Sequence, residues 1–84
     1  MHLIWFEKAW KDYLYWQTQD KKTLKKINEI IKDIERSAGK GIGKGELLKG
    51  DLSVFSSKRI DKMTRLVYRI SESNLEIASC KNHY

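Results

Sequence analysis

Few side chains of this 84-residue chain could carry acid–base chemistry, since it has only two histidines. Glu46 lies between Lys44 and Lys49, and nearby cations favour the ionised carboxylate that a general base requires. His83 is the penultimate residue, and the terminal carboxylate beside it favours the protonated imidazole of a general acid. The alternatives are a glutamate that merely screens two lysines and a histidine in a frayed chain end.

Two arginines add positive charge that suits a phosphate. Arg59 and Arg65 lie on neighbouring predicted strands, where their planar guanidinium groups could converge on one anion. The alternative is cross-strand ion pairing with Asp61 or Glu76. A base, an acid and cations are together the groups that cleave RNA without a metal. The base deprotonates the 2′-hydroxyl, the acid protonates the leaving 5′-oxygen, and the cations stabilise the phosphorane.

The basic residues concentrate in one part of the chain. Residues 36–69 hold nine basic groups and three acidic ones, a difference equal to the whole chain's net charge of +6. An acidic partner is implied, and phosphates are the commonest one, although a solvated surface explains the charge equally well. The nine basic residues are Arg36, Lys40, Lys44, Lys49, Lys58, Arg59, Lys62, Arg65 and Arg69.

Composition excludes several classes of protein. The length fits a single domain over residues 1–84. The single cysteine, Cys80, cannot form an internal disulfide, and we find no bilayer-spanning run and no signal peptide, so a cytoplasmic protein with no membrane partner is expected. One cysteine and two distant histidines cannot build a zinc site, and residues 39–45 lack the ending of a P-loop. No metal and no cofactor are therefore expected.

The elements that position these groups can be read from the spacing of apolar residues. Residues 2–6 predict a short buried strand, and residues 7–17 repeat apolar side chains at helical spacing. Residues 21–36 predict a second helix with Asp20 as its N-cap. Two helices joined so briefly should form an antiparallel hairpin.

The second half of the chain predicts strands. They cover residues 52–55, 57–60, 65–70 and 75–80, with a turn at 71–74. This order predicts an α+β fold in which an N-terminal strand and an antiparallel helix hairpin pack on one face of a small, mainly antiparallel β-sheet. A short extension of the last strand should carry His83 and Tyr84 along the sheet edge.

A long connection separates the helices from these strands. All five glycines lie between residues 39 and 50, and the chain has no proline to stiffen them. A long irregular loop inside a compact domain is often functional, and this one contains Glu46.

Several segments together resemble a known family. They are residues 10–17 (WKDYLYWQ), 20–22, 25–28, 65–68 (RLVY) and 78–84, which close the chain with HY. Over essentially its whole length the chain resembles the YoeB family within the wider RelE-like group. The resemblance implies a RelE-like fold and a ribosome-dependent endoribonuclease that inhibits translation by cleaving mRNA in the A site. It also implies an antitoxin partner, usually of the YefM type, whose C-terminal segment wraps the toxin, and often a homodimer.

The resemblance also implies roles for individual residues. Glu46 matches the family's proposed general base, and His83 matches its proposed general acid. Arg65 matches the arginine that stabilises the phosphorane, and Tyr84 matches the terminal tyrosine that helps orient the reacting nucleotide.

A further set of residues is expected to bind RNA. Lys49 and Arg59 match basic residues that hold RNA in the family, and Lys44 and Lys58 lie beside them in the basic segment. Two alternatives stay open: a basic RNA- or ribosome-binding module that blocks translation by occupancy, and a domain whose basic patch serves only its acidic antitoxin. The joint presence of a candidate base and acid favours the nuclease, because neither alternative requires them.

The chain departs from the family beside the candidate base. The family usually has prolines at the positions of Gly45 and Leu47, and an aromatic residue is common where this chain has Ser56. The chemical groups remain, but two restraints on the backbone around Glu46 are gone.

The missing prolines give a first prediction. We expect Gly45→Pro combined with Leu47→Pro to raise cleavage severalfold, because ordering one residue costs roughly 1–2 kcal/mol and a compatible proline recovers about 0.4–1 kcal/mol of it. Cleavage of ribosome-bound message and thermal melting are measured on the same preparation. A lower melting temperature with no gain in rate would mean that Leu47 instead packs into the core.

Overall fold

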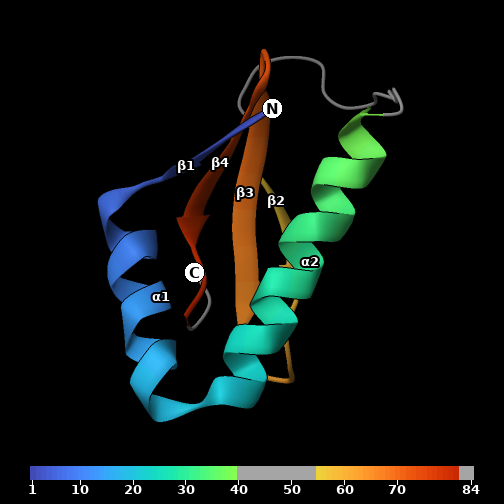
Figure 1. Ribbon diagram of the computed structural model, residues 1–84. Coiled ribbons are helices and arrows are strands. Elements are labelled where there is room, and N and C mark those ends of the chain that lie inside the picture. Colours follow the sequence, from blue (N-terminus) through green and yellow to red (C-terminus); the bar gives the residue numbers. More distant parts are fainter. Residues whose placement is uncertain (40–54, 82–84) are drawn as a thin grey trace.

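The structure, a computed structural model, describes residues 1–39 and 55–81. Within them, two helices follow the first strand and three more strands follow the helices (Figure 1). The elements are β1 (His2–Trp5), α1 (Glu7–Gln19), α2 (Lys21–Gly39), β2 (Ser56–Arg59), β3 (Arg65–Ser71) and β4 (Asn74–Ser79). The predicted α+β class is confirmed, and the predicted bounds of these elements differ by up to three residues. Residues 52–54 of the predicted strand at 52–55 lie outside the described residues.

The four described strands form one mixed sheet in the order β1-β4-β3-β2. β2 and β3 pair antiparallel, as do β3 and β4, whereas β1 runs parallel to β4. β4 therefore lies between β1 and β3, and the predicted extension that carries His83 and Tyr84 lies outside the described residues. A β-bulge between Val67 and Tyr68 shifts the register near the end of β4.

The helix hairpin turns at Asp20, whose side chain caps the N-terminus of α2. The Asp20 Oδ1 atom accepts hydrogen bonds from the main-chain N–H groups of Lys22 at 3.1 Å and Thr23 at 3.2 Å, and Oδ2 accepts one from the Thr23 hydroxyl at 2.9 Å. These bonds, the Thr23 hydroxyl first, hold the pKa of the Asp20 carboxyl below its ordinary value. The predicted N-cap is confirmed.

The core lies between the helices and one face of the sheet (Figure 1). α2 buries a stripe of four isoleucines at helical spacing, Ile27, Ile30, Ile31 and Ile34, whereas Leu24 on the same helix is half-buried. The buried apolar residues are Ala9, Ile27, Ile30, Ile31, Ile34, Ile60, Leu66, Leu75, Ile77 and Cys80. No helix in the described ranges has the length and hydropathy needed to cross a bilayer.

The N-terminal aromatic residues divide into two groups. Trp5, Tyr13 and Trp16 pack partly buried against the core, whereas Trp10 and Tyr15 are more than 40 % exposed. The aromatic density of the first sixteen residues therefore only partly reflects core packing.

The core gives a second prediction. Leu75 is fully buried in β4, so Leu75→Ala should lower the free energy of unfolding by about 2–5 kcal/mol through lost burial and a residual cavity. Met63→Ala is the matched control, because Met63 is 77 % exposed and should change stability by less than about 0.5 kcal/mol. Urea denaturation of both variants measures the difference, and equal midpoints would contradict this core.

Candidate functional site

The two candidate arginines lie directly opposite each other. The register of β2 and β3 pairs Arg59 with Arg65, so both side chains stand on the same face of the sheet. Leu66, the next residue along β3, is buried in the core, and side chains alternate along a strand. The arginine pair therefore stands on the face turned away from the helices, and both residues are exposed.

The two acidic residues that the sequence offers as partners of these arginines, Asp61 and Glu76, form hydrogen bonds with other groups. Glu76 accepts a hydrogen bond from Arg69 Nε at 2.5 Å, and Asp61 Oδ1 accepts from the main-chain N–H groups of Met63 and Thr64. The ion pairs that the sequence suggested between Arg59 or Arg65 and these acids are therefore not formed. Within residues 1–39 and 55–81, neither Arg59 nor Arg65 has an acidic partner within salt-bridge distance.

Arg69 is held by its neighbours on the same face. Its guanidinium carbon lies 4.9 Å from the centroid of the Phe55 ring and 5.9 Å from that of Phe6, in addition to the ion pair with Glu76. The two phenyl rings also meet edge to face at 6.1 Å. This cluster fastens Phe55, the residue that precedes β2, to the start of α1.

Lys58 stands apart from the arginine pair. Its register partner is the buried Leu66, which places Lys58 on the helix side of the sheet, although its side chain is exposed at the β2 edge. Because neighbouring strand residues point to opposite faces, Lys58 and Arg59 cannot present their charges in the same direction.

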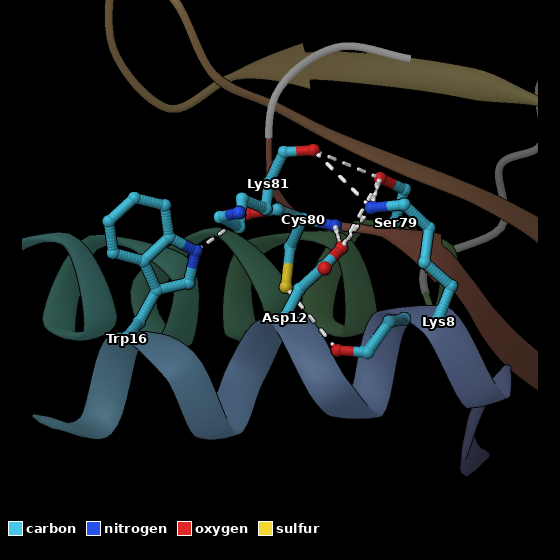
Figure 2. Close-up of polar contacts among 7 residues, drawn as sticks. Lys8, Asp12, Trp16, Ser79, Cys80 and Lys81 are labelled. Carbon is cyan, nitrogen blue, oxygen red and sulfur yellow. Dashed lines mark hydrogen bonds and ion pairs between the residues drawn. The ribbon is translucent and has the colours of Figure 1, made fainter. Parts of the chain in front are cut away.

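The end of β4 is anchored to α1 by a buried carboxylate (Figure 2). Asp12, only 7 % exposed, accepts hydrogen bonds at Oδ2 from Lys8 Nζ at 2.6 Å and from the Cys80 main-chain N–H at 3.0 Å. One turn further along α1, Trp16 Nε1 donates to the Cys80 carbonyl oxygen at 2.8 Å. Both main-chain polar groups of Cys80 are thus bound by side chains of one helix.

The residues on either side of Cys80 join the same cluster. Lys8 Nζ donates to Ser79 Oγ at 3.1 Å and to the Lys81 carbonyl oxygen at 3.5 Å. The Lys81 ammonium lies 4.4 Å from the centroid of the Tyr15 ring. We call this cluster the C-terminal anchor: Lys8, Asp12, Trp16 and residues 79–81. Sequence reasoning missed it, since Asp12 reads as an ordinary exposed acid of a charged helix.

The Cys80 thiol is not a reactive group. Cys80 is fully buried, and its Sγ donates to the Ala9 carbonyl oxygen at 3.7 Å. Burial, and secondarily the charge of Asp12, raises the pKa of the thiol to about 12. At neutral pH the group stays protonated, so it offers no thiolate nucleophile.

The remaining predicted site residues lie outside the described residues. They are Lys44, Glu46, Lys49, His83 and Tyr84. The structure describes their attachment points: Gly39 at the end of α2, Phe55 before β2, and Lys81 after β4. In the described ranges, no three His, Cys, Asp or Glu side chains gather closely enough to hold a metal ion.

The arginine pair gives a third prediction. Like charges directly opposite each other on a sheet are destabilising, so Arg59→Gln should raise the free energy of unfolding by roughly 0.2–1 kcal/mol at low ionic strength. The gain should shrink at high salt, which screens the repulsion in the parent chain. Arg36→Gln is the control, because Arg36 has an acidic neighbour, Asp33, at 2.9 Å. Thermal melting at two salt concentrations measures both variants. The repulsion argument fails if Arg59→Gln is the less stable of the two.

Comparisons with known proteins agree with this architecture. Residues 5–84 match the family model described as the YoeB-like toxin of bacterial type II toxin–antitoxin systems. The toxin YoeB of Escherichia coli O6:H1 is 55 % identical over 84 residues, which cover the whole of both chains. Two solved structures from Staphylococcus aureus, each 45 % identical, cover all of this chain and 98 % of their own. One is a YoeB dimer with a TM-score of 0.79, and the other is a YoeB–YefM complex with a TM-score of 0.77. This chain therefore belongs to the YoeB-like toxins of bacterial type II toxin–antitoxin systems.

Proposed function

We propose that this chain is an endoribonuclease that cleaves messenger RNA in the ribosomal A site and thereby inhibits translation. The observation that carries the proposal is the Arg59–Arg65 pair, two exposed cations facing each other on the sheet face that the helices leave open. Such a pair is unfavourable by itself and becomes favourable when an anion lies between the two guanidinium groups. A phosphodiester has the charge and the oxygen geometry for that position.

The proposed reaction needs no metal. Glu46 removes the proton of a ribose 2′-hydroxyl, and the resulting oxygen attacks the adjacent phosphorus. Arg65 stabilises the charge of the phosphorane, in which the bond from phosphorus to the 5′-oxygen then breaks. His83 gives its proton to that leaving oxygen, while Tyr84 orients the nucleotide. The products are a 2′,3′-cyclic phosphate and a 5′-hydroxyl, so atoms and charge balance.

The ribosome is proposed to hold the substrate for this small domain. Arg59, with Lys44 and Lys49, supplies positive charge for RNA, and Lys58 adds charge from the β2 edge and not from the face of the arginine pair. Phosphate contacts of this kind fix position but do not read sequence. A domain of 84 residues offers few other groups to read a codon. Cleavage of ribosome-bound message should therefore greatly exceed cleavage of free RNA, and binding should weaken steeply with salt.

Two protein partners are proposed as well. The Staphylococcus aureus relatives form a YoeB dimer and a YoeB–YefM complex, and we extend both assemblies to this chain. An acidic antitoxin segment of the YefM type would lie over the arginine pair and neutralise it, which would also block access of RNA. Both partners are expected in the cytoplasm.

A second candidate function is a block of translation by occupancy, with weak catalysis. It is favoured by the absence of proline at positions 45 and 47, which leaves the backbone beside Glu46 less restrained. The two functions give different products, since occupancy leaves the message intact.

The fourth prediction separates these functions. Defined message on ribosomes should be cut when the protein is added, and the same message with a 2′-deoxy sugar at the cut site should survive because the nucleophile is missing. His83→Ala should lower the cleavage rate by about 10²–10⁴ while ribosome binding is kept, and Arg59→Ala should weaken binding more than chemistry. Mapping of 3′ ends and a ribosome pelleting assay give the two readouts. Stalled but uncut message would establish occupancy, and cutting of the 2′-deoxy message would eliminate 2′-hydroxyl attack.

A further inference from the structure

We propose that Phe6, Phe55 and Arg69 form a base-stacking subsite, which binds a nucleobase of the RNA whose phosphate lies at the arginine pair. The inference rests on the proposed function for the identity of the ligand. It adds a second contact, to a base, at three described residues to which the proposed reaction gives no role.

The sheet face that the helices leave open has two chemically different ends. Arg65 and Arg69 stand on this face four residues apart in β3, which separates them by about 13 Å. At one end, Arg59 and Arg65 have no acidic partner among the described residues. At the other end, Glu76 compensates the charge of Arg69, whose guanidinium group lies over the Phe55 ring. The first end suits a phosphate, and the second offers aromatic surface whose neighbouring charge is already paired.

The two phenyl rings at the second end are accessible and held in place. Phe55 is 43 % exposed and Phe6 is 36 % exposed, although both side chains are large and apolar. The rings meet edge to face at 6.1 Å, and the Arg69 guanidinium carbon lies 4.9 Å from the Phe55 centroid and 5.9 Å from the Phe6 centroid. A flat ligand that stacks on rings already ordered in this way costs little further conformational freedom.

A nucleobase is the ligand that suits this end when a phosphate occupies the other. Single-stranded nucleic acid alternates charged phosphates with flat bases, and proteins bind it with cationic grooves and with aromatic side chains on which the bases stack. Val67 stands between Arg65 and Arg69 on the same face and adds no charge between the two ends. Stacked nucleotides rise about 3.4 Å each, so a span of about 13 Å reaches beyond the nucleotide at the arginine pair.

The alternative is a purely structural cluster that fastens Phe55 to the start of α1. Phe6 is the N-cap residue of α1 but makes no capping hydrogen bond through its side chain, so its ring is not needed to begin the helix. A structural cluster would tolerate or lose stability on substitution without regard to the bases of a bound RNA. A stacking subsite would make RNA affinity depend on one particular base.

The test measures how the whole chain binds a short single-stranded RNA. Every sugar of the oligomer is 2′-O-methylated, which removes the nucleophile and separates binding from cleavage. One base at a time is then removed to give a series of abasic oligomers, and affinities are measured by NMR titration at low ionic strength. In the parent chain, loss of the stacked base should weaken binding at least about fivefold, the lower end of what one stacked base contributes.

Three variants identify the ring. Phe55→Leu should bind the intact oligomer at least about fivefold more weakly, and removal of the critical base should then have no additional effect. Phe55→Trp keeps an aromatic face and should bind like the parent chain. Tyr15→Leu is the matched control, because Tyr15 is also 43 % exposed and has the Lys81 ammonium 4.4 Å from its ring centroid, but it lies on α1. It should bind every oligomer like the parent chain.

Salt dependence separates the two ends of the face. Arg65→Gln should reduce the slope of log affinity against log salt by about 0.7, the value for one phosphate contact on a single strand. Arg69→Gln combined with Glu76→Gln keeps the net charge, because the two residues form an ion pair. This double variant should lower the affinity with the slope unchanged, since it frees the Phe55 ring without removing a phosphate contact.

Each outcome decides the inference. It is overturned if the parent chain does not bind the oligomer, if no base matters, or if base removal costs the parent chain and Phe55→Leu equally. Equal weakening by Phe55→Leu and Phe55→Trp, with lower melting temperatures for both, would assign the cluster a structural role only. Ring-dependent binding of a polyglutamate peptide in place of RNA would identify a protein ligand and overturn the base.

The proposed function is judged separately, by cleavage of ribosome-bound message. Uncut message together with base-dependent binding would remove the nuclease and leave the subsite standing. Cut message without any base dependence at the Phe55 ring would remove the subsite and leave the nuclease.

Discussion

The burial of one carboxylate governs how this fold is assembled. Asp12 has almost no contact with solvent, and its Oδ2 atom gathers hydrogen bonds from Lys8, Ser79 and Cys80. A buried acceptor must be satisfied, so α1 has to lie where the end of β4 can supply its main-chain N–H. This requirement joins a helix near the start of the chain to the last described strand across 68 residues of sequence. Removing the acceptor would leave the buried Cys80 N–H without its partner.

The described contacts hold the residues that adjoin the two undescribed segments, 40–54 and 82–84. The segment with Glu46 rejoins the sheet at Phe55, which the Arg69 guanidinium and the Phe6 ring hold. Lys81, the last described residue, follows the end of β4 and accepts a hydrogen bond from Lys8 of α1 at its carbonyl oxygen. Phe6 is the N-cap residue of α1, so a single helix touches both points of attachment. The helix therefore links Phe55 to Lys81 through its own side chains and its N-cap residue.

Local features of the fold were predictable from sequence, and distant pairings were not. The stripe of isoleucines in α2 and the cap at Asp20 depend on residues three or four apart, where spacing is informative. The parallel partner of β1 lies more than 70 residues away, and hydropathy carries no signal for that choice. Asp12 follows Lys11 in a charged stretch, which suggests an exposed acid. Only the tertiary structure reveals that Asp12 is buried and that its carboxylate accepts a hydrogen bond from the main-chain N–H of Cys80.

The candidate site shows the same division. Neighbouring strands for Arg59 and Arg65 could be predicted because turn and strand signals are local, and the structure confirms their pairing. The ion pair between Glu76 and Arg69 could not be predicted, because Arg59, Arg65 and Arg69 are all candidates for it in the sequence. The register of β3 and β4 selects Arg69 by placing it opposite Glu76. The remaining catalytic and RNA-binding roles stay predictions, because the residues concerned lie outside the described ranges. They are Lys44, Glu46, Lys49, His83 and Tyr84.

The pairing of β1 with β4 determines how early the sheet can form during synthesis of the chain. During synthesis the N-terminal segments leave the ribosome first, and α1 and α2 can form their hairpin from local contacts alone. β1 has no strand to pair with until residues 74–77 emerge, and α1 has no main-chain donor for Asp12 until Cys80 follows. Pairings between such distant residues form late, because loop-closure entropy opposes them. The nascent chain thus cannot close its sheet before residues 74–80 have left the ribosome, so the helix hairpin must exist for a time without the sheet on which it packs.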